Sequence, residues 1–184
     1  AFKCGRIQGV IIYKMTSIEE IEKKQSEFND REANTLGVDI KNVTDLDSVF
    51  NLDTKIVFSL SIVPSKKFIK NDDFWSKIVK NQEKIDTLFL DERLIEHELV
   101  NLNDFEGTKY LTLSTKTKPR DYEMLFNKYA RLGIDGINFD IENLTKGQIA
   151  LCSKFKLISC AHSLAFDRHL EKAKELQLDS ISYV

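Results

Sequence analysis

The sequence contains few cysteines, glycines and prolines, and it has no long hydrophobic run. Its 184 residues include only three Cys, seven Gly and two Pro. Cys4, Cys152 and Cys160 are odd in number and form no CxxC pair, so they make a poor disulfide framework and favour a reduced, intracellular protein. No apolar run approaches the roughly 20 residues that a membrane-spanning helix needs. Without linker-like segments, residues 1–184 are expected to form a single domain.

The chain also lacks a strong charge of either sign. Its net charge of −2 at pH 7 gives no attraction toward nucleic acid or an anionic membrane. It has no GxGxxG loop, no Walker motif and no GxSxG turn, which argues against nucleotide cofactors and serine-hydrolase chemistry. A small polar ligand or substrate remains the expected partner, and a protein partner stays open. The start of the chain does not resemble a signal peptide.

Short β-branched, apolar runs alternate with longer amphipathic stretches along most of the chain. This alternation is typical of βα units around a parallel sheet. Eight such runs predict a compact (β/α)₈ TIM-type barrel of the α/β class, with an open doubly wound sheet as the alternative. The predicted strands are Gly9–Met15, Val38–Val43, Lys55–Ile62, Asp86–Asp91, Lys109–Thr115, Gly136–Ile141, Leu157–Ser163 and Ser180–Val184.

The predicted helices include one through Tyr122 and Leu132, where apolar residues recur at helical spacing before Gly133. A shorter helix is expected through Ile149, with Asn143 or Thr145 as its N-cap.

Polar side chains are expected to face the interior of the barrel. In residues 136–142, the apolar Ile137, Phe139 and Ile141 alternate with Asn138, Asp140 and Glu142. The apolar set should pack on the helices, which leaves the polar set inside the barrel. Other strands repeat the pattern with small hydroxyls at Ser59, Ser61, Thr112 and Ser114, and with Phe89 and Asp91 between leucines. A polar interior is costly unless it is hydrogen-bonded or wet, which indicates a site for a polar ligand.

Asp140 and Glu142 are the leading catalytic candidates. Two carboxylates on one strand face repel each other and raise one pKa, and an acid that stays protonated near neutral pH can donate a proton. Two acids paired with Lys or Arg at a strand end are the structural alternative.

Further candidates lie at other strand ends. The candidate substrate-binding residues are Asp91, which has Arg93 close by in sequence, Asn138 and Ser114. His162 is a candidate proton carrier or metal ligand. Asp91 should face the interior and Glu92 the outside. Together with Asp140 and Glu142, Asp91 and His162 could bind Mg²⁺ or Ca²⁺. His169, within a charged helical segment, is expected at the surface.

Most of the chain resembles the glycerophosphodiester phosphodiesterase family in the order and spacing of its segments. The resemblance rests on VTDLDSVFNLDTKIVFSLSI at 43–62, on LGIDGINFDIENLTKGQIALCSKFKLISCAHS at 132–163 and on LEKAKELQLDSISYV at 170–184. It implies a TIM barrel that acts on phosphodiesters. The family's HRG and ExD motifs have no counterpart here. The position of the family's EIK strand is occupied by Ser59-Leu60-Ser61-Ile62. The Asp that ends the family's closing strand is absent from Ser182-Tyr183-Val184. No catalytic or metal-binding residue is therefore carried over, and a catalytically degenerate relative is included in the expectation.

A second resemblance is local. DGINFDIE at 135–142 is similar to the DGxDxDxE signature of family 18 chitinases, with Asn138 where an Asp is usual. It implies Glu142 as the acid that protonates the glycosidic oxygen and Asp140 as its partner. Three hypotheses follow: a phosphodiesterase-like barrel hydrolase, a family 18-like glycoside hydrolase, or a non-catalytic barrel that binds a ligand or a protein.

Overall fold

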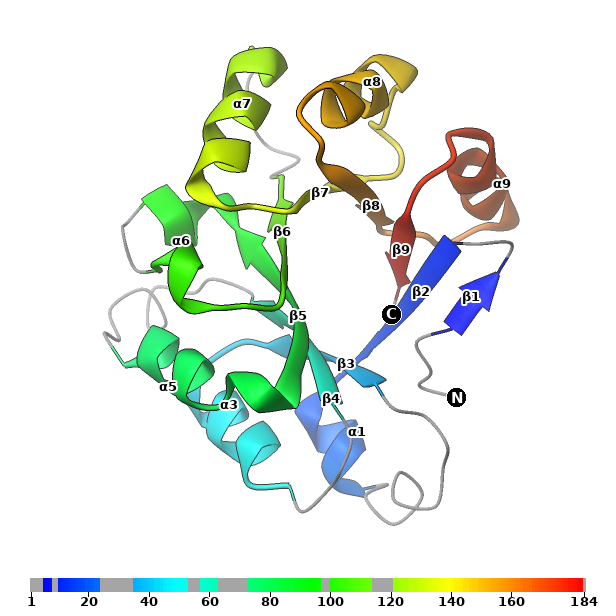
Figure 1. The fold of residues 1–184 in the computed structure, drawn as a ribbon. Coiled ribbons are helices and arrows are strands. Elements are labelled where there is room, and N and C mark those ends of the chain that lie inside the picture. Colours follow the sequence, from blue (N-terminus) through cyan, green and yellow to red (C-terminus); the bar gives the residue numbers. More distant parts are fainter. Residues whose placement is uncertain are drawn as a thin grey trace.

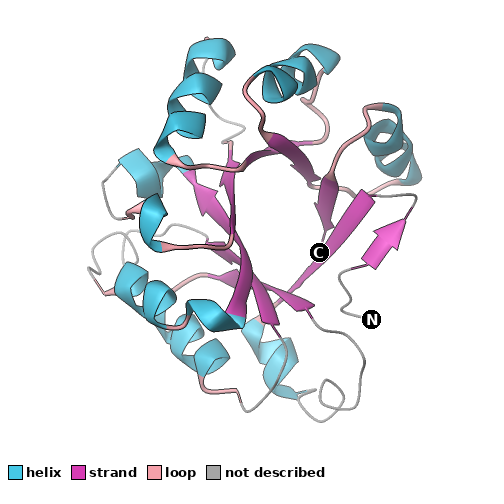
Figure 2. Ribbon diagram, viewed as in Figure 1, coloured by secondary structure: helices cyan, strands magenta, loops and turns pink. Residues whose placement is uncertain are grey.

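Eight parallel strands close into a barrel, with helices on its outer side (Figures 1 and 2). The computed structural model describes residues 5–7, 10–23, 35–52, 57–62, 73–96, 100–113 and 121–183. Each strand from β2 to β9 pairs in parallel with the next, and β2 pairs with β9 from Ile11↔Ser180 to Lys14↔Tyr183, which closes the barrel. The strands are β1 (Gly5–Ile7), β2 (Val10–Thr16), β3 (Thr35–Ile40), β4 (Val57–Ile62), β5 (Ile85–Asp91), β6 (Thr108–Thr112), β7 (Gly136–Asp140), β8 (Ile158–His162) and β9 (Ser180–Tyr183).

This architecture confirms the predicted TIM-type barrel, and the open doubly wound sheet is wrong. Each of the eight predicted strands overlaps one barrel strand. The second prediction was shifted, because β3 ends at Ile40 and Val43 already begins a helix. The sequence analysis also missed β1, which pairs antiparallel with the start of β2.

The helices follow the strands in the order that a βα barrel requires. They are α1 (Ile18–Lys23), α3 (Val43–Phe50), α5 (Phe74–Lys80), α6 (Glu92–Glu96), α7 (Tyr122–Leu132), α8 (Lys146–Lys154) and α9 (Asp167–Glu175), with 3₁₀ turns η1 (Gln82–Lys84) and η2 (Leu102–Asp104). No helix of the described residues is both long and apolar enough to cross a membrane.

Polar side chains fix where several helices begin. The Asn42 side chain accepts a hydrogen bond from the backbone N–H of Asp45, whose carboxylate accepts from Asn42 in return. Thr145 and Gln148 form the same reciprocal capping box at α8, so Thr145 and not Asn143 is the N-cap. At the end of α7, Gly133 takes a left-handed conformation with φ of 101°, as helix-terminating glycines commonly do.

The predicted alternation of side chains in the strands is confirmed on the outer face. One apolar core lies between the strands and the helices. The outer-face strand residues in it include Phe58, Leu60, Leu88, Leu90, Leu111, Ile137 and Phe139. The rings of Phe139 on β7 and Phe126 on α7 meet edge-on at 5.9 Å between centroids. This layer buries the apolar half of each strand and so leaves the other half to the barrel interior.

A second, smaller core fills the barrel itself. It consists of Met15, Phe89, Tyr110 and Cys160, with the rings of Phe89 and Tyr110 stacked at 5.0 Å between centroids. The Tyr110 hydroxyl is 3.0 Å from the Ser180 hydroxyl, which pairs two buried polar groups. These residues close the interior below its C-terminal mouth, where the strand ends carry polar side chains.

Candidate functional site

The mouth of the barrel holds a cavity of about 700 Å³ to which every barrel strand contributes. Active sites of TIM barrels lie at this C-terminal end of the strands. The lining mixes hydroxyl, amide, imidazole and carboxyl groups with a few apolar side chains, which suits a small polar ligand. The lining residues are Met15, Asp39, Ser61, Phe89, Thr112, Asn138, His162, Ser182 and the segment Ser163-Leu164-Ala165.

Two polar atoms in this lining are buried without a hydrogen-bond partner among the described residues. They are Oδ1 of Asn138 and Nε2 of His162, on the adjacent strands β7 and β8. The other end of the Asn138 amide donates to the Thr112 hydroxyl at 3.2 Å, which orients the side chain. Buried polar groups are almost always paired, so these two atoms are available to hydrogen-bond a polar ligand in the cavity.

His162 is poised as a neutral imidazole. Burial lowers its pKa below the usual 6.5, and the nearby charge of Asp140 opposes that shift. Its Nδ1 is 2.9 Å from the hydroxyl of Ser163, a residue held in the left-handed region at φ of 65°. A non-glycine residue in this region is strained, and such strain gathers at functional sites. A neutral imidazole of this kind can accept a proton near neutral pH.

Asp39 is a lining residue that the sequence analysis missed. It lies on β3, and burial raises its pKa, while the charge of Lys41 and a hydrogen bond with Ser61 act in the opposite direction. The alternation in residues 35–40 places Gly37 and Asp39 on the interior face opposite Ser59 and Ser61. Asp39 lies inside the predicted strand Val38–Val43, but it was not among the candidate site residues.

Asp140 and Glu142 do not share a strand face as expected, because β7 ends at Asp140. The Asp140 carboxylate accepts a hydrogen bond from the backbone N–H of Glu142 at 2.9 Å, so Glu142 lies in a turn. Its side chain is 54% exposed and pairs with His169 and Arg168. A hydrogen bond from His169 is the main cause that lowers the pKa of Glu142, which is the opposite of the predicted shift.

The remaining candidates are separated from the cavity or lie outside the described residues. Asp91 pairs through both carboxylate oxygens with Arg93, at 2.9 and 3.1 Å, and is not among the cavity-lining residues. Glu92, expected to face outward, is buried at the start of α6. Ser114 falls in the undescribed segment 114–120. His169 was expected at the surface, but its side chain is buried.

The donor groups do not make a ready metal site. Across the described ranges, no three His, Cys, Asp or Glu side chains come together to hold an ion. The Mg²⁺ or Ca²⁺ that the sequence allowed therefore finds no preformed set of ligands in that part of the chain, since Ca²⁺ takes six to eight oxygen ligands and Mg²⁺ a near-octahedral set.

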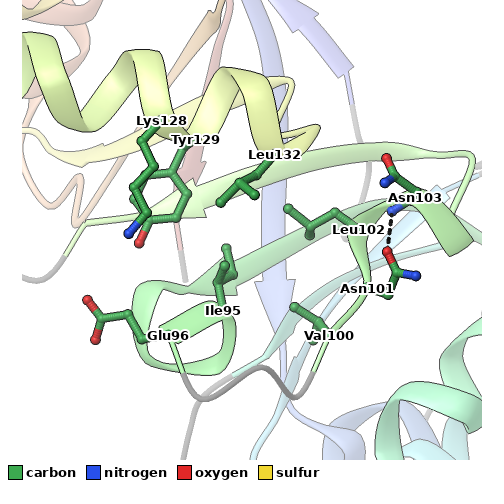
Figure 3. Close-up of a pocket in the computed structure, with 9 residues that line it drawn as sticks. All are labelled: Ile95, Glu96, Val100, Asn101, Leu102, Asn103, Lys128, Tyr129 and Leu132. Carbon is green, nitrogen blue, oxygen red and sulfur yellow. Dashed lines mark hydrogen bonds between the residues drawn. The ribbon is translucent and has the colours of Figure 1, made fainter.

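A second cavity of about 400 Å³ lies outside the barrel, between α6, η2 and α7 (Figure 3). Its lining is partly apolar, with side chains from Ile95, Val100, Leu102 and Leu132. The charged residues Glu96 and Lys128 also line it. It borders residues 97–99, which the structure does not describe, and no barrel strand contributes a residue to its lining. The barrel mouth is therefore the candidate site.

Comparison with solved structures identifies the type of barrel. The sequence itself matches no family model and no curated protein. A protein assigned as a glycerophosphoryl diester phosphodiesterase from Agrobacterium tumefaciens is similar, with a TM-score of 0.66, 10% identity and 92% of each chain covered. One assigned as a glycerophosphodiester phosphodiesterase from Galdieria sulphuraria gives a TM-score of 0.64 at 10% identity, covering 96% of this chain and 95% of that one.

The fold of the chain is therefore the TIM barrel that these solved structures share. An HpcH/HpaI aldolase from Desulfitobacterium hafniense is also similar, with a TM-score of 0.61, 7% identity and coverage of 95% of this chain and 85% of that one. Because aldolases and phosphodiesterases share this architecture, the likeness establishes the fold, and the chemistry has to be argued from the cavity.

Proposed function

We propose that this protein is a barrel hydrolase that binds small glycerol-based phosphodiesters in the cavity at the barrel mouth. The observation that carries the proposal is the pair of orphaned atoms, Asn138 Oδ1 and His162 Nε2, in a polar cavity of about 700 Å³. Asn138 Oδ1 would accept a hydrogen bond from a ligand hydroxyl, and the hydroxyl groups of Ser61, Thr112 and Ser182 also line the cavity. The phosphodiesterase-like fold supports the choice of substrate class.

The phosphate group would enter a mouth in which burial disfavours the charged forms of two lining side chains. Burial raises the pKa of Asp39 and lowers the pKa of His162. Lys41, at the end of β3, lies close enough to Asp39 to lower that pKa, so it places a positive charge beside the cavity. The helices that follow the strands also direct their N-terminal partial charge toward this end of the barrel.

His162 and Asp39 would each carry out one of the two proton transfers of hydrolysis. His162 would take the proton of an attacking water as a new phosphorus–oxygen bond forms. Asp39 would give its proton to the departing alcohol oxygen as the old bond breaks. Proton exchange with solvent would then restore both groups. Burial perturbs the pKa of both groups within one cavity, as is common for titratable groups at functional sites.

A non-catalytic ligand-binding barrel is the second candidate. It is favoured by the lack of any three-residue carboxylate or imidazole cluster within the described ranges. The glycoside hydrolase is not carried forward, because its acid would be Glu142, which is ionised, paired with His169 and outside the cavity lining.

Hydrolysis of glycerophosphocholine tests the proposal directly. Release of glycerol phosphate would be measured for the wild type, His162→Gln and Glu171→Gln, with EDTA, Mg²⁺ or Ca²⁺ present. Glu171 is an exposed acid on α9 outside the cavity lining and is the matched control. We expect turnover in the wild type and the control, reduced about 10²- to 10⁴-fold in His162→Gln, the usual contribution of a general base. Binding without turnover would favour the second candidate, and neither binding nor turnover would overturn the proposal.

A further inference from the structure

The segment between β8 and α9 forms part of the rim of the barrel-mouth cavity. Ser163, Leu164 and Ala165 line the cavity, and Phe166 follows them immediately before α9. This segment, residues 163–166, is called the rim loop below. It carries the strained Ser163 whose hydroxyl contacts His162, so its position bears directly on the candidate site.

His169, in the first turn of α9, holds the rim loop from behind. Its Nδ1 accepts hydrogen bonds from the backbone N–H groups of Ala165, at 3.0 Å, and Phe166, at 3.3 Å. An atom that accepts two N–H groups carries no hydrogen, so the proton of this imidazole lies on Nε2. That nitrogen is 2.6 Å from Oε1 of Glu142 and must donate to it. The His169 side chain is only 4% exposed, so its ring is shielded from water.

Glu142 accepts the hydrogen bond from Nε2 of His169 and is itself held by residues of α9. Besides His169, its Oε1 accepts from the Arg168 guanidinium at 2.9 Å. Lys172 of α9 donates to the backbone carbonyls of Ile141 and Glu142, at 2.7 and 3.3 Å. The turn after β7 is therefore tied to α9 by three side chains. Hydrogen bonds to charged groups are stronger than neutral ones, so this turn is a firm support for the imidazole.

The arrangement is a modified capping box. In the usual form, a Glu or Gln at the third helical position accepts from the N-cap backbone N–H. Here His169 stands at that position, accepts from Phe166 at the N-cap and also reaches Ala165. The imidazole accepts with Nδ1 and donates with Nε2, and Nε2 connects the cap to Glu142. The helix cap and the β7 turn are thereby joined through one buried ring.

We propose that Glu142 and His169 are positioning residues that hold the rim loop against the barrel mouth. The sequence motif that ends in Glu142 thus acts on the site through the loop, without touching a ligand. The consequence for binding rests on the proposed function, whereas the position of the loop does not. Removing the acceptor at residue 169 should release the Ala165 and Phe166 amides and leave the barrel strands unaffected.

Amide hydrogen exchange of the unliganded protein, measured by NMR, tests the positioning. The variants are His169→Ala, His169→Gln and Glu142→Ala, with Glu171→Gln as the control. We expect exchange at Ala165 and Phe166 to rise at least tenfold in His169→Ala and by less in Glu142→Ala. His169→Gln should restore protection at Phe166, because glutamine retains the capping acceptor. Glu142 is half-exposed, so its variant serves as the second test if His169→Ala does not fold.

The two proposals fail in different ways. Unchanged exchange at Ala165 and Phe166 in a folded His169→Ala or Glu142→Ala protein would overturn the positioning, whatever the ligand data show. Failure of the wild type to bind glycerophosphocholine would overturn the proposed function and leave the exchange result to decide the loop. If the wild type binds, affinity should fall about tenfold in His169→Ala and recover in His169→Gln. Faster exchange with unchanged affinity would contradict a role for this loop at the site.

Discussion

The Asp140 carboxylate accepts a hydrogen bond from the backbone N–H of Glu142, at 2.9 Å. This contact ends β7 and begins a turn in which the Asn143 N–H also bonds to the Asp140 carbonyl, at 3.2 Å. Asp140 and Glu142 are spaced to share one face of a strand. They do not share it, because β7 ends at Asp140 and Glu142 lies in the turn that follows. The end of the motif therefore contributes a turn and a support for α9, while Asn138 within the motif lines the cavity together with residues of the other strands.

We predict that Asp140→Ala destabilises the protein by about 0.5–1.5 kcal/mol, the usual net value of one hydrogen bond. Asp140→Asn keeps an acceptor for the Glu142 N–H and should cost less. Urea unfolding at pH 7 measures both. An Asp140→Ala variant as stable as the wild type would show that the turn does not depend on this bond.

His162 should make stability depend on pH. Because burial lowers its pKa in the folded protein, the unfolded chain binds the additional proton first as pH falls. The stability that the neutral imidazole contributes is present above the unfolded value of about 6.5 and is lost as pH falls toward the lower folded-state pKa. Unfolding free energies of the wild type and His162→Gln, measured from pH 8 to pH 5, isolate this group. The wild type should lose more stability than the variant, and parallel profiles would contradict the account.

Two glycines should respond in opposite directions to replacement by alanine. A Cβ at Gly136 in β7 would lie 2.6 Å from atoms of Ile158 and Tyr110 and 2.7 Å from the Ile158 carbonyl oxygen. Since backbone cannot move aside cheaply, Gly136→Ala should cost about 1–3 kcal/mol or more. At Gly147 in α8, the nearest atom is 3.8 Å away, so alanine should stabilise by about 0.5–1 kcal/mol through helix propensity. Thermal melting of both variants checks this, and equal melting points would refute the close packing at Gly136.

The sequence predicted the barrel well because each strand has its own apolar, β-branched pattern. Phe58 and Leu60 reveal the outer face of β4 without any knowledge of its neighbours. The strand ends were harder to predict, because side-chain hydrogen bonds decide them. Asn42 and Asp45 cap the helix that follows β3, so the predicted strand Val38–Val43 ran too far, and β7 ends at Asp140, which leaves Glu142 in a turn.

The candidate site was predicted only in part for a related reason. Asn138 and His162 were found because they lie within regular strands, where alternation fixes the direction of a side chain. His169 was misplaced because its charged helical neighbours suggested a surface residue. Its burial comes from contacts with the rim loop and Glu142, and Glu142 is 27 residues away in sequence. Such contacts between distant loops leave no local periodic signal.

The most direct test of the central claim is thermal melting with glycerophosphocholine, for the wild type and Asn138→Ala. A ligand that binds only the folded protein raises its stability by about 2.7 kcal/mol at 100 times Kd, which shifts the melting temperature of a protein this size by several degrees. We predict such a shift in the wild type and a much smaller one in Asn138→Ala, because that variant lacks the orphaned Oδ1 acceptor. No shift in the wild type, or equal shifts in both proteins, would contradict a ligand site at the barrel mouth.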